Sequence, residues 1–431
     1  MKFNLLLLSL LLFSFSASAS TTPATKKISY QISLKYLMDN IHPAGTAKGI
    51  VVASPSKSHP DYFYHWVRDA ALVMNTVIDL ASREKNNDIK NKLRESIFDY
   101  VKRVQNIQLI SGFTSLGEPK YHVDGSLFTG PWGRPQHDGP ALRAITLIKW
   151  ANKLISEGQI DYVLKELYSP ILPAKSPIKQ DLEYTARYFD KQGFDYWEEV
   201  KGLHFATAMA QRKALLMGAK LAKRLGDLNA IQFYTEKAKL VENLIQKFWS
   251  KEKGHILATL KQTGGVSKSH LDISTVLGVL HGNTNDGFYS LLDSKVLKTI
   301  TKIEASFKRL YPINQNNNLN LATAIGRYPE DTYNGYNTNG TGHAWFLATF
   351  SMAEFHLKLA TRLESNFILN DINFYCQLLK LKKCQELSDS PKQFKKAILA
   401  ALNKKALAFF KRADYHAAIG GHMSEQMNRH N

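Results

Sequence analysis

Cysteine is scarce in this sequence: Cys376 and Cys384 are the only two among 431 residues. Two thiolates cannot form a four-cysteine zinc site, and the sequence contains no His-Glu-x-x-His segment, so we predict neither a metal nor any other cofactor. In an oxidising compartment the two thiols could form one disulfide that closes a short loop, and a pair of reduced thiols is the alternative.

Long apolar runs are also scarce, and the longest covers residues 5–15. A membrane-spanning helix needs about 20 apolar residues, so this run is too short to span a bilayer. Lys2 precedes it and an Ala-x-Ala pattern follows at positions 17–19, which is typical of a secretory signal peptide. We therefore predict a signal peptide over residues 1–19 and a mature protein that is secreted or periplasmic and not anchored in a membrane.

Acidic residues are fewer than basic ones, 37 against 56, which gives a formal net charge of +19 at pH 7. Such an excess is found in nucleic-acid-binding proteins. Here, however, the basic residues are scattered through amphipathic segments, as at Arg212, Lys213, Lys220 and Lys223. This pattern favours a solvated basic surface, so we predict no nucleic-acid partner.

Strand-like alternation is rare, whereas apolar residues at spacings of three and four predict one helix after another. The predicted helices span residues 69–85, 90–108, 140–157, 161–188, 204–224, 228–248, 296–311, 343–363 and 393–412. No Ser/Thr/Pro-rich linker divides the chain, and 44% of its residues are apolar, enough for a sizeable core. We predict a single all-α domain over residues 20–431 and a monomer.

Longer segments rich in glycine, proline and aromatic residues separate these helices, and loops of this length inside a domain usually carry function. Aromatic rings stand beside carboxylates and arginines in the segments 61–69, 130–140, 194–200 and 326–333. Sugars need this mixture, because their C–H faces stack on rings while their hydroxyls require polar partners. The loops therefore favour a carbohydrate site, and the alternative is a set of core aromatics with helix-end ion pairs.

Glu198 is the candidate acid in these loops, because it lies between Trp197 and Glu199. An indole on one side and a like charge on the other both favour the protonated carboxyl, which a leaving-group donor requires. A pair of carboxylates near the N-terminus of the following helix is the structural alternative.

Five segments carry a resemblance to a known family: H-P-D-Y-F-Y-H-W-V-R-D at 59–69, D-G-S-L-F-T-G-P-W-G-R-P-Q-H-D-G-P-A-L-R-A at 124–144, D-Y-W-E-E-V at 195–200, G-R-Y-P-E-D-T-Y-N-G at 326–335 and M-S-E-Q at 423–426. Together and in this order, they resemble the glucoamylase family of inverting glycoside hydrolases. The resemblance implies an (α/α)6 barrel of six inner and six outer helices, with the active site in the loops at one end.

Residue roles follow from this resemblance. It implies that Glu198 is the general acid and Glu425 the general base, with Asp195 first a pocket residue and second a candidate proton acceptor. The implied substrate-binding residues are Arg68, Asp69, Arg327 and Tyr62 around the terminal glucose, Trp132 and Glu199 at the next sugar, and Trp66, Arg134, Trp197 and Trp345 as the walls of the pocket.

The activity implied by the resemblance is the release of β-glucose from the non-reducing ends of starch, glycogen or malto-oligosaccharides, at α-1,4 links and more slowly at α-1,6 links. A related α-glucosidase for trehalose or isomaltose and a glucan-binding protein with impaired catalysis are the alternatives. The second arises because Glu425 lies only six residues before Asn431. We therefore expect the final helix that closes the family's barrel to be missing, and we expect no starch-binding domain.

Overall fold

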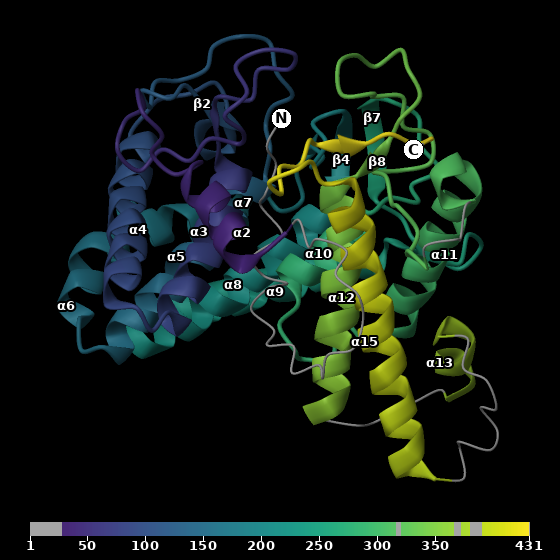
Figure 1. Cartoon of the computed structure of the whole chain (residues 1–431). Coiled ribbons are helices and arrows are strands. Elements are labelled where there is room, and N and C mark those ends of the chain that lie inside the picture. Colours follow the sequence, from purple (N-terminus) through teal and green to yellow (C-terminus); the bar gives the residue numbers. More distant parts are fainter. Residues whose placement is uncertain (1–27, 316–319, 366–371, 380–389, 431) are drawn as a thin grey trace.

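Figure 1 shows the computed structural model, which describes residues 28–315, 320–365, 372–379 and 390–430. The described helices are α2 (Tyr30–Met38), α3 (Val67–Arg83), α4 (Asn87–Gln108), α5 (Asp138–Ser156), α6 (Ile160–Tyr162), α7 (Pro177–Tyr188), α8 (Phe205–Leu225), α9 (Leu228–Gln246), α10 (Ser274–Gly282), α11 (Ser294–Leu310), α12 (Phe346–Ser365), α13 (Ile372–Leu379) and α15 (Pro391–His416). The predicted all-α fold is confirmed.

The helices form two layers. The inner helices α5, α8, α10 and α12 bury residues on almost every side, whereas α4, α9, α11 and α15 bury a single stripe and expose the rest. Consecutive inner helices contact one another from α3 through α5, α8 and α10 to α12, and each also contacts an outer helix that follows it in the chain. This alternation is that of an (α/α) barrel.

Short strands gather at one end of the barrel, at the top of Figure 1. They are β1 (His65–Trp66), β2 (Lys120–Tyr121), β3 (Gly193–Phe194), β4 (Val200–His204), β5 (Trp249–Ser250), β6 (His255–Ile256), β7 (Thr259–Gly265), β8 (Ala344–Trp345) and β9 (Gln426–Met427). β1 runs directly into α3, β4 into α8 and β8 into α12. The antiparallel pairs β1–β2, β4–β7 and β8–β9 therefore anchor distant loops at the N-terminal ends of three inner helices.

The predicted helix over 161–188 is wrong. α6 and a π-helical turn at Val163–Leu167 are followed by an irregular stretch, and α7 begins only at Pro177. Pro170 and Pro173 lie in that stretch, and each proline lacks a backbone N–H and disfavours helical backbone at the residue before it. Pro177 is tolerated because it occupies the first turn of α7.

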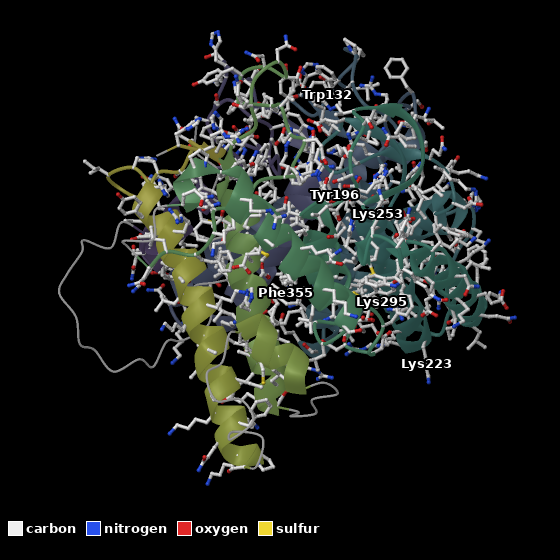
Figure 2. The ribbon with its side chains drawn as sticks, turned by 90° about the vertical axis from the view of Figure 1, so that its right-hand side faces the viewer. Trp132, Tyr196, Lys223, Lys253, Lys295 and Phe355 are labelled. Atoms are coloured by element: carbon white, nitrogen blue, oxygen red, sulfur yellow. The ribbon has the colours of Figure 1, made fainter. Side chains whose placement is uncertain are left out.

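Three helices were not predicted: α2, α10 and α13. Most residues of α10 are buried, so its short and almost wholly apolar sequence shows no helical periodicity. Of the four basic residues named as surface charges, Lys220 and Lys223 are exposed (Lys223 is labelled in Figure 2). Arg212, in contrast, is buried and forms ion pairs with Glu242 and Asp286.

Cys376 in α13 is disulfide-bonded, and Cys384, the other cysteine of the sequence, lies outside the described residues. The predicted signal peptide 1–19 also lies outside them. None of the helices in the described ranges has the length and apolar character needed to cross a membrane.

Candidate active site

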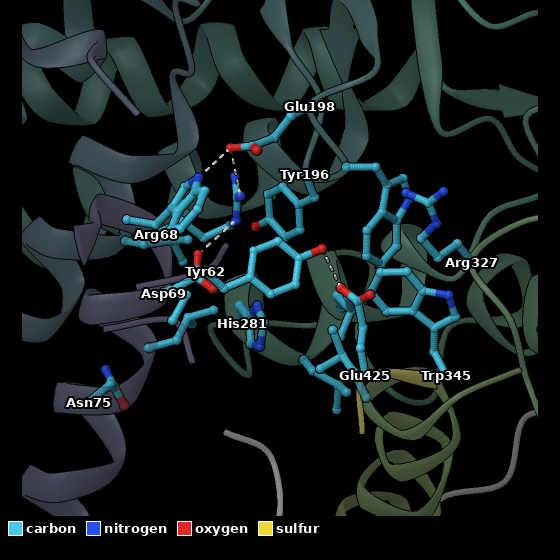
Figure 3. Close-up of a pocket in the computed structure, with 18 of the residues that line it drawn as sticks. Tyr62, Arg68, Asp69, Asn75, Tyr196, Glu198, His281, Arg327, Trp345 and Glu425 are labelled. Carbon is cyan, nitrogen blue, oxygen red and sulfur yellow. Dashed lines mark hydrogen bonds and ion pairs between the residues drawn. The ribbon is translucent and has the colours of Figure 1, made fainter. Parts of the chain in front are cut away.

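A cavity of about 710 Å³ opens among the loops at the strand-bearing end and extends between the inner helices to Asn75 and His281 (Figure 3). The predicted residues that line it are Tyr62, Trp66, Arg68, Asp69, Trp132, Trp197, Glu198, Glu199, Arg327, Trp345 and Glu425. Glu198 and Glu425, separated by 226 intervening positions in the sequence, therefore face one cavity.

A tight turn presents Glu198 to the cavity. The Glu198 amide donates to the Asp195 carbonyl at 2.9 Å, and Asp195 Oδ1 accepts from the amides of Glu199 and Val200 at 2.8 and 2.9 Å. Glu198 itself has a φ of +65°, in the left-handed region that costs a residue with a Cβ on the order of 1–3 kcal/mol. The hydrogen bonds of Asp195 hold the turn in this conformation.

Both carboxyl oxygens of Glu198 accept hydrogen bonds. Oε1 accepts from Trp66 Nε1 at 2.9 Å and from Gln136 Nε2 at 2.8 Å, and Arg68 Nη2 lies 3.4 Å from the same atom. Oε2 accepts from Trp132 Nε1 at 2.9 Å. Donors from two distant segments, Trp66 with Arg68 and Trp132 with Gln136, thus fix the plane of this carboxyl group.

Glu425 has a different environment. Its Oε1 accepts from the hydroxyl of Tyr62 at 3.0 Å (Figure 3). The Tyr62 hydroxyl also lies 2.9 Å from the hydroxyl of Tyr333. Its Oε2 is buried and has no hydrogen-bond partner among the described residues. Burial raises the pKa of Glu425 to about 7, although the hydrogen bond from Tyr62 and the charge of Arg327 act in the opposite direction.

Arg68 and Asp69 lie at the start of α3, next to Glu198. Arg68 Nη1 donates to Gln136 Oε1 at 2.9 Å and to Asp138 Oδ2 at 3.0 Å, and its Nε lies 3.6 Å from Asp69 Oδ2. Burial raises the pKa of Asp69 to about 6, against the effect of Arg68. This cluster places both a cation and carboxyl oxygens at the cavity wall, where they suit the hydroxyls of a sugar.

A second ion pair lies on the Glu425 side of the cavity. Arg327 donates to both oxygens of Asp331, at 2.8 and 2.6 Å, and its Nη2 lies 2.7 Å from Glu199 Oε1. The hydroxyl of Tyr328 donates to Glu199 Oε2 at 2.6 Å. Glu199 is therefore fully engaged as an acceptor, in contrast to the free oxygen of Glu425.

Asp195 and Arg134 do not belong to the described cavity lining. Asp195 is 6% exposed, and its Oδ2 accepts from Lys268 at 3.2 Å. Burial opposes its ionisation, but the charge of Lys268 holds its pKa below the usual value. Arg134 binds Glu118 Oε2 and the carbonyls of Gly130 and Phe128, each at 3.0 Å, so it braces the loop that carries Trp132.

Several residues of the site were missed by the sequence reasoning. Gln136 and Tyr333 lie inside segments that carry the resemblance, so their neighbours were a usable signal. Lys120 and Lys268 lie outside those segments, and nothing in their local sequence indicates that folding brings them to Trp132 and Asp195. Among the residues that the structure describes, no group of three His, Cys, Asp or Glu side chains could hold a metal ion.

A helical barrel with two carboxyl groups across one aromatic cavity has the arrangement that glycoside hydrolases use. Residues 31–431 match the family described as glycosyl hydrolases family 15, and the chain therefore belongs to that family.

Its relatives include a glucoamylase of Blastobotrys adeninivorans, 36% identical over 92% of this chain and 66% of the relative, and glucoamylase 1 of Rhizopus oryzae, 40% identical over 80% of this chain and 56% of the relative. The chain thus spans less than two thirds of the length of these relatives.

Solved structures of the family agree with the fold. The family 15 glucoamylase from Hypocrea jecorina has a TM-score of 0.80 and 31% identity over 92% of this chain and 66% of that chain. The glucoamylase from Saccharomycopsis fibuligera has a TM-score of 0.79 and 30% identity over 92% of this chain and 88% of that chain. The predicted (α/α)6 barrel class is confirmed.

Proposed function

We propose that the chain is an exported glucoamylase that releases β-glucose from the non-reducing ends of starch, glycogen or malto-oligosaccharides. In this proposal it cleaves α-1,4 links, and α-1,6 links more slowly. The observation that carries the proposal is the placement of Glu198 and Glu425 in one cavity, in unlike surroundings. An inverting glycosidase needs one carboxyl group to protonate the leaving oxygen and another to activate a water on the opposite face of the sugar.

The two carboxyl groups have different hydrogen-bond partners, which supports giving them different roles. Glu198 is fixed in position by Trp66, Trp132 and Gln136, so its carboxyl group keeps one orientation toward the glycosidic oxygen that it protonates. The unpartnered oxygen of Glu425 accepts the proton of the attacking water, while its other oxygen is held by Tyr62. The water oxygen attacks the anomeric carbon, the glycosidic bond breaks, and the configuration inverts.

Substrate binding follows from the remaining polar groups. Arg68 and Asp69 supply donors and acceptors for the hydroxyls of the terminal glucose, and Arg327 supports that glucose from the other wall. The indole rings of Trp132 and Trp345 offer flat faces for the C–H surfaces of sugars. Asp195 acts in this scheme as a positioning residue, because its carboxylate is occupied by the turn and by Lys268.

Polarimetry during maltose cleavage tests the proposal, because it reports turnover and the anomer released in one measurement. We expect β-glucose from the full chain and a fall in kcat of at least about 1,000-fold in E198Q, with maltose binding retained. Release of α-glucose would contradict inversion, and an active E198Q would contradict the acid assignment. Parallel assays on isomaltose and trehalose test the linkage, since the proposal requires maltose to be the fastest of the three.

A further inference from the structure

Lys120 is a buried, positively charged residue beside the cavity, and the reaction proposed above gives it no role. It lies in β2, directly opposite Trp66 of β1 in the antiparallel register, and the residue is 2% exposed. Its ammonium group lies 3.3 Å from the ring centroid of Trp132, 4.6 Å from that of Trp66, and 4.0 and 4.4 Å from those of Phe128 and Tyr64. Four aromatic rings therefore surround one cation.

The two tryptophans of this cage are the ones that hold Glu198. Trp66 donates to Oε1 and Trp132 to Oε2, both at 2.9 Å, and the two indole rings meet edge to face with centroids 5.9 Å apart. A cation over an indole face is attracted by the ring quadrupole, most strongly where water is excluded. Lys120 thus contacts the rings of two of the side chains that donate hydrogen bonds to the Glu198 carboxyl group.

A structural role alone does not account for the charge. Burying an ammonium group without a counterion costs free energy, and burial lowers the pKa of Lys120 to about 8. No described residue makes a hydrogen bond or ion pair with its ammonium group that would offset this cost. A methionine would fill the same space without the desolvation cost.

Lys120 and the charged groups near it interact electrostatically with the Glu198 carboxyl group. Glu198 and Asp61 interact favourably with Lys120, and Arg134 opposes them. Glu198 is also faced by Arg68, with Asp69 and Asp138 beyond it, and it is followed in the chain by Glu199. When Glu198 gives its proton to the leaving oxygen, Lys120 therefore favours the carboxylate that remains.

We propose that Lys120 is a positioning residue for the acid of the proposed reaction: it orients Trp66 and Trp132 around Glu198 and stabilises the carboxylate that forms when the proton is transferred. This inference rests on the proposed function. Both tryptophans of the cage donate to Glu198, whereas Trp66 alone also meets the ring of Tyr62, with centroids 6.0 Å apart, so loss of the cage acts mainly on protonation of the leaving group.

The test compares K120M, K120R and K57M with the unmodified full chain. Lys57 is a matched control, because its ammonium lies 4.4 Å from the Phe63 ring in an exposed setting with no contact to Glu198. Each variant is assayed on maltose, which needs a protonated leaving group, and on α-glucosyl fluoride, whose fluoride leaves with little protonation. Maltose kcat is recorded against pH, and thermal melting and maltose binding report folding.

We expect K120M to lower maltose kcat by about 10- to 100-fold and α-glucosyl fluoride kcat by less than about 3-fold. The alkaline limb of the maltose profile should move upward by roughly half to one pH unit, because a positive charge near the acid is lost. K120R should keep the limb in place, and K57M should match the unmodified chain. If K120M does not fold, the maltose pH profiles of K120R and K120Q test the proposal instead. The alkaline limb should stay in place in K120R and move upward in K120Q.

Equal losses on both substrates, or an unmoved limb in folded K120M, would overturn the role of Lys120. If the unmodified chain hydrolyses neither substrate, the proposed function itself fails. The two failures are therefore distinguishable.

Discussion

Glu425 carries a pKa that links the site to the stability of the chain. Its ordinary value of 4.5 is raised to about 7 by burial. Below pH 4.5 the carboxyl is protonated in both the folded and the unfolded state and contributes nothing. Between pH 4.5 and about 7 the carboxyl is ionised in the unfolded state but still protonated in the folded state, so the free energy of unfolding falls as the pH rises. Above about pH 7 it is ionised in both states, and the fall is complete.

Glutamine carries no charge to desolvate, so we expect E425Q to be more stabilising at pH 8 than at pH 4, with a difference of roughly 3 kcal/mol in the free energy of unfolding. Thermal melting at both pH values measures this difference. E95Q removes an exposed carboxylate from α4 and is the matched control. If the melting temperature of E425Q shows no greater pH dependence than that of E95Q, the buried-charge explanation is wrong.

Side-chain partners mark the limit of what the sequence could predict about the site. Most cavity residues were predictable, because Arg68, Trp132 and Glu198 lie in long aromatic and polar segments. The contact of Tyr62 with Glu425 was not, since 363 positions separate them and only the folded barrel brings them together. The same holds for Lys268, which lies in the irregular segment after β7 and binds Asp195 from there.

Helices were predictable where they are long and have one apolar stripe, as in α9 and α11. The apolar stripe does not identify α10, because neighbouring elements bury most of this helix. It also misleads in the stretch before α7, where Pro170 and Pro173 prevent a helix despite the apolar spacing. The strands escaped prediction for another reason. Most have only two residues, too few for an alternating pattern.

Close packing between α8 and α10 depends on a glycine. A Cβ added to Gly278 would lie 2.7 Å from Ala206 Cα, a backbone atom that cannot move without shifting α8. Alanine gains about 1 kcal/mol of helix propensity over glycine, but the overlap costs more than that gain.

We therefore expect G278A to destabilise the fold by about 1–3 kcal/mol, measured as a fall in the midpoint of denaturant unfolding. Gly264 in β7 offers the control, because nothing lies within 4 Å of a Cβ built there and its φ is not in the positive range. G264A should change stability by less than about 0.5 kcal/mol. A stable G278A would mean that α8 and α10 can separate at little cost.

In the molecule as a whole, the helices form a barrel, and the residues of the proposed site lie in the loops at its strand-bearing end. Inner helices α3, α8 and α12 each begin where a short strand ends, so the loops that bear Trp66, Glu198 and Trp345 are attached directly to the barrel. The (α/α) order of the frame followed from the resemblance, whereas the periodicity alone indicated only an all-α chain.

Export is the remaining expectation about the intact chain. Expressed with its own N-terminus, the protein should be recovered outside the cytoplasm with Ser20 as its first residue, because residues 1–19 have the pattern that signal peptidase cleaves. Intact-mass measurement of the recovered protein checks the cleavage site. A full-length chain that keeps Met1 and stays in the cytoplasm would contradict the signal-peptide assignment.

The left-handed backbone of Glu198 has a consequence for engineering. Glycine or asparagine would occupy that conformation with less strain, so the residue proposed to do the chemistry is not the one that the backbone prefers. Gly or Asn at position 198 would relieve this strain, but it would also remove acceptors from Trp66, Trp132 and Gln136 and abolish the proposed hydrolysis. Laboratory evolution toward thermostability in this family member must therefore be screened on turnover in every round.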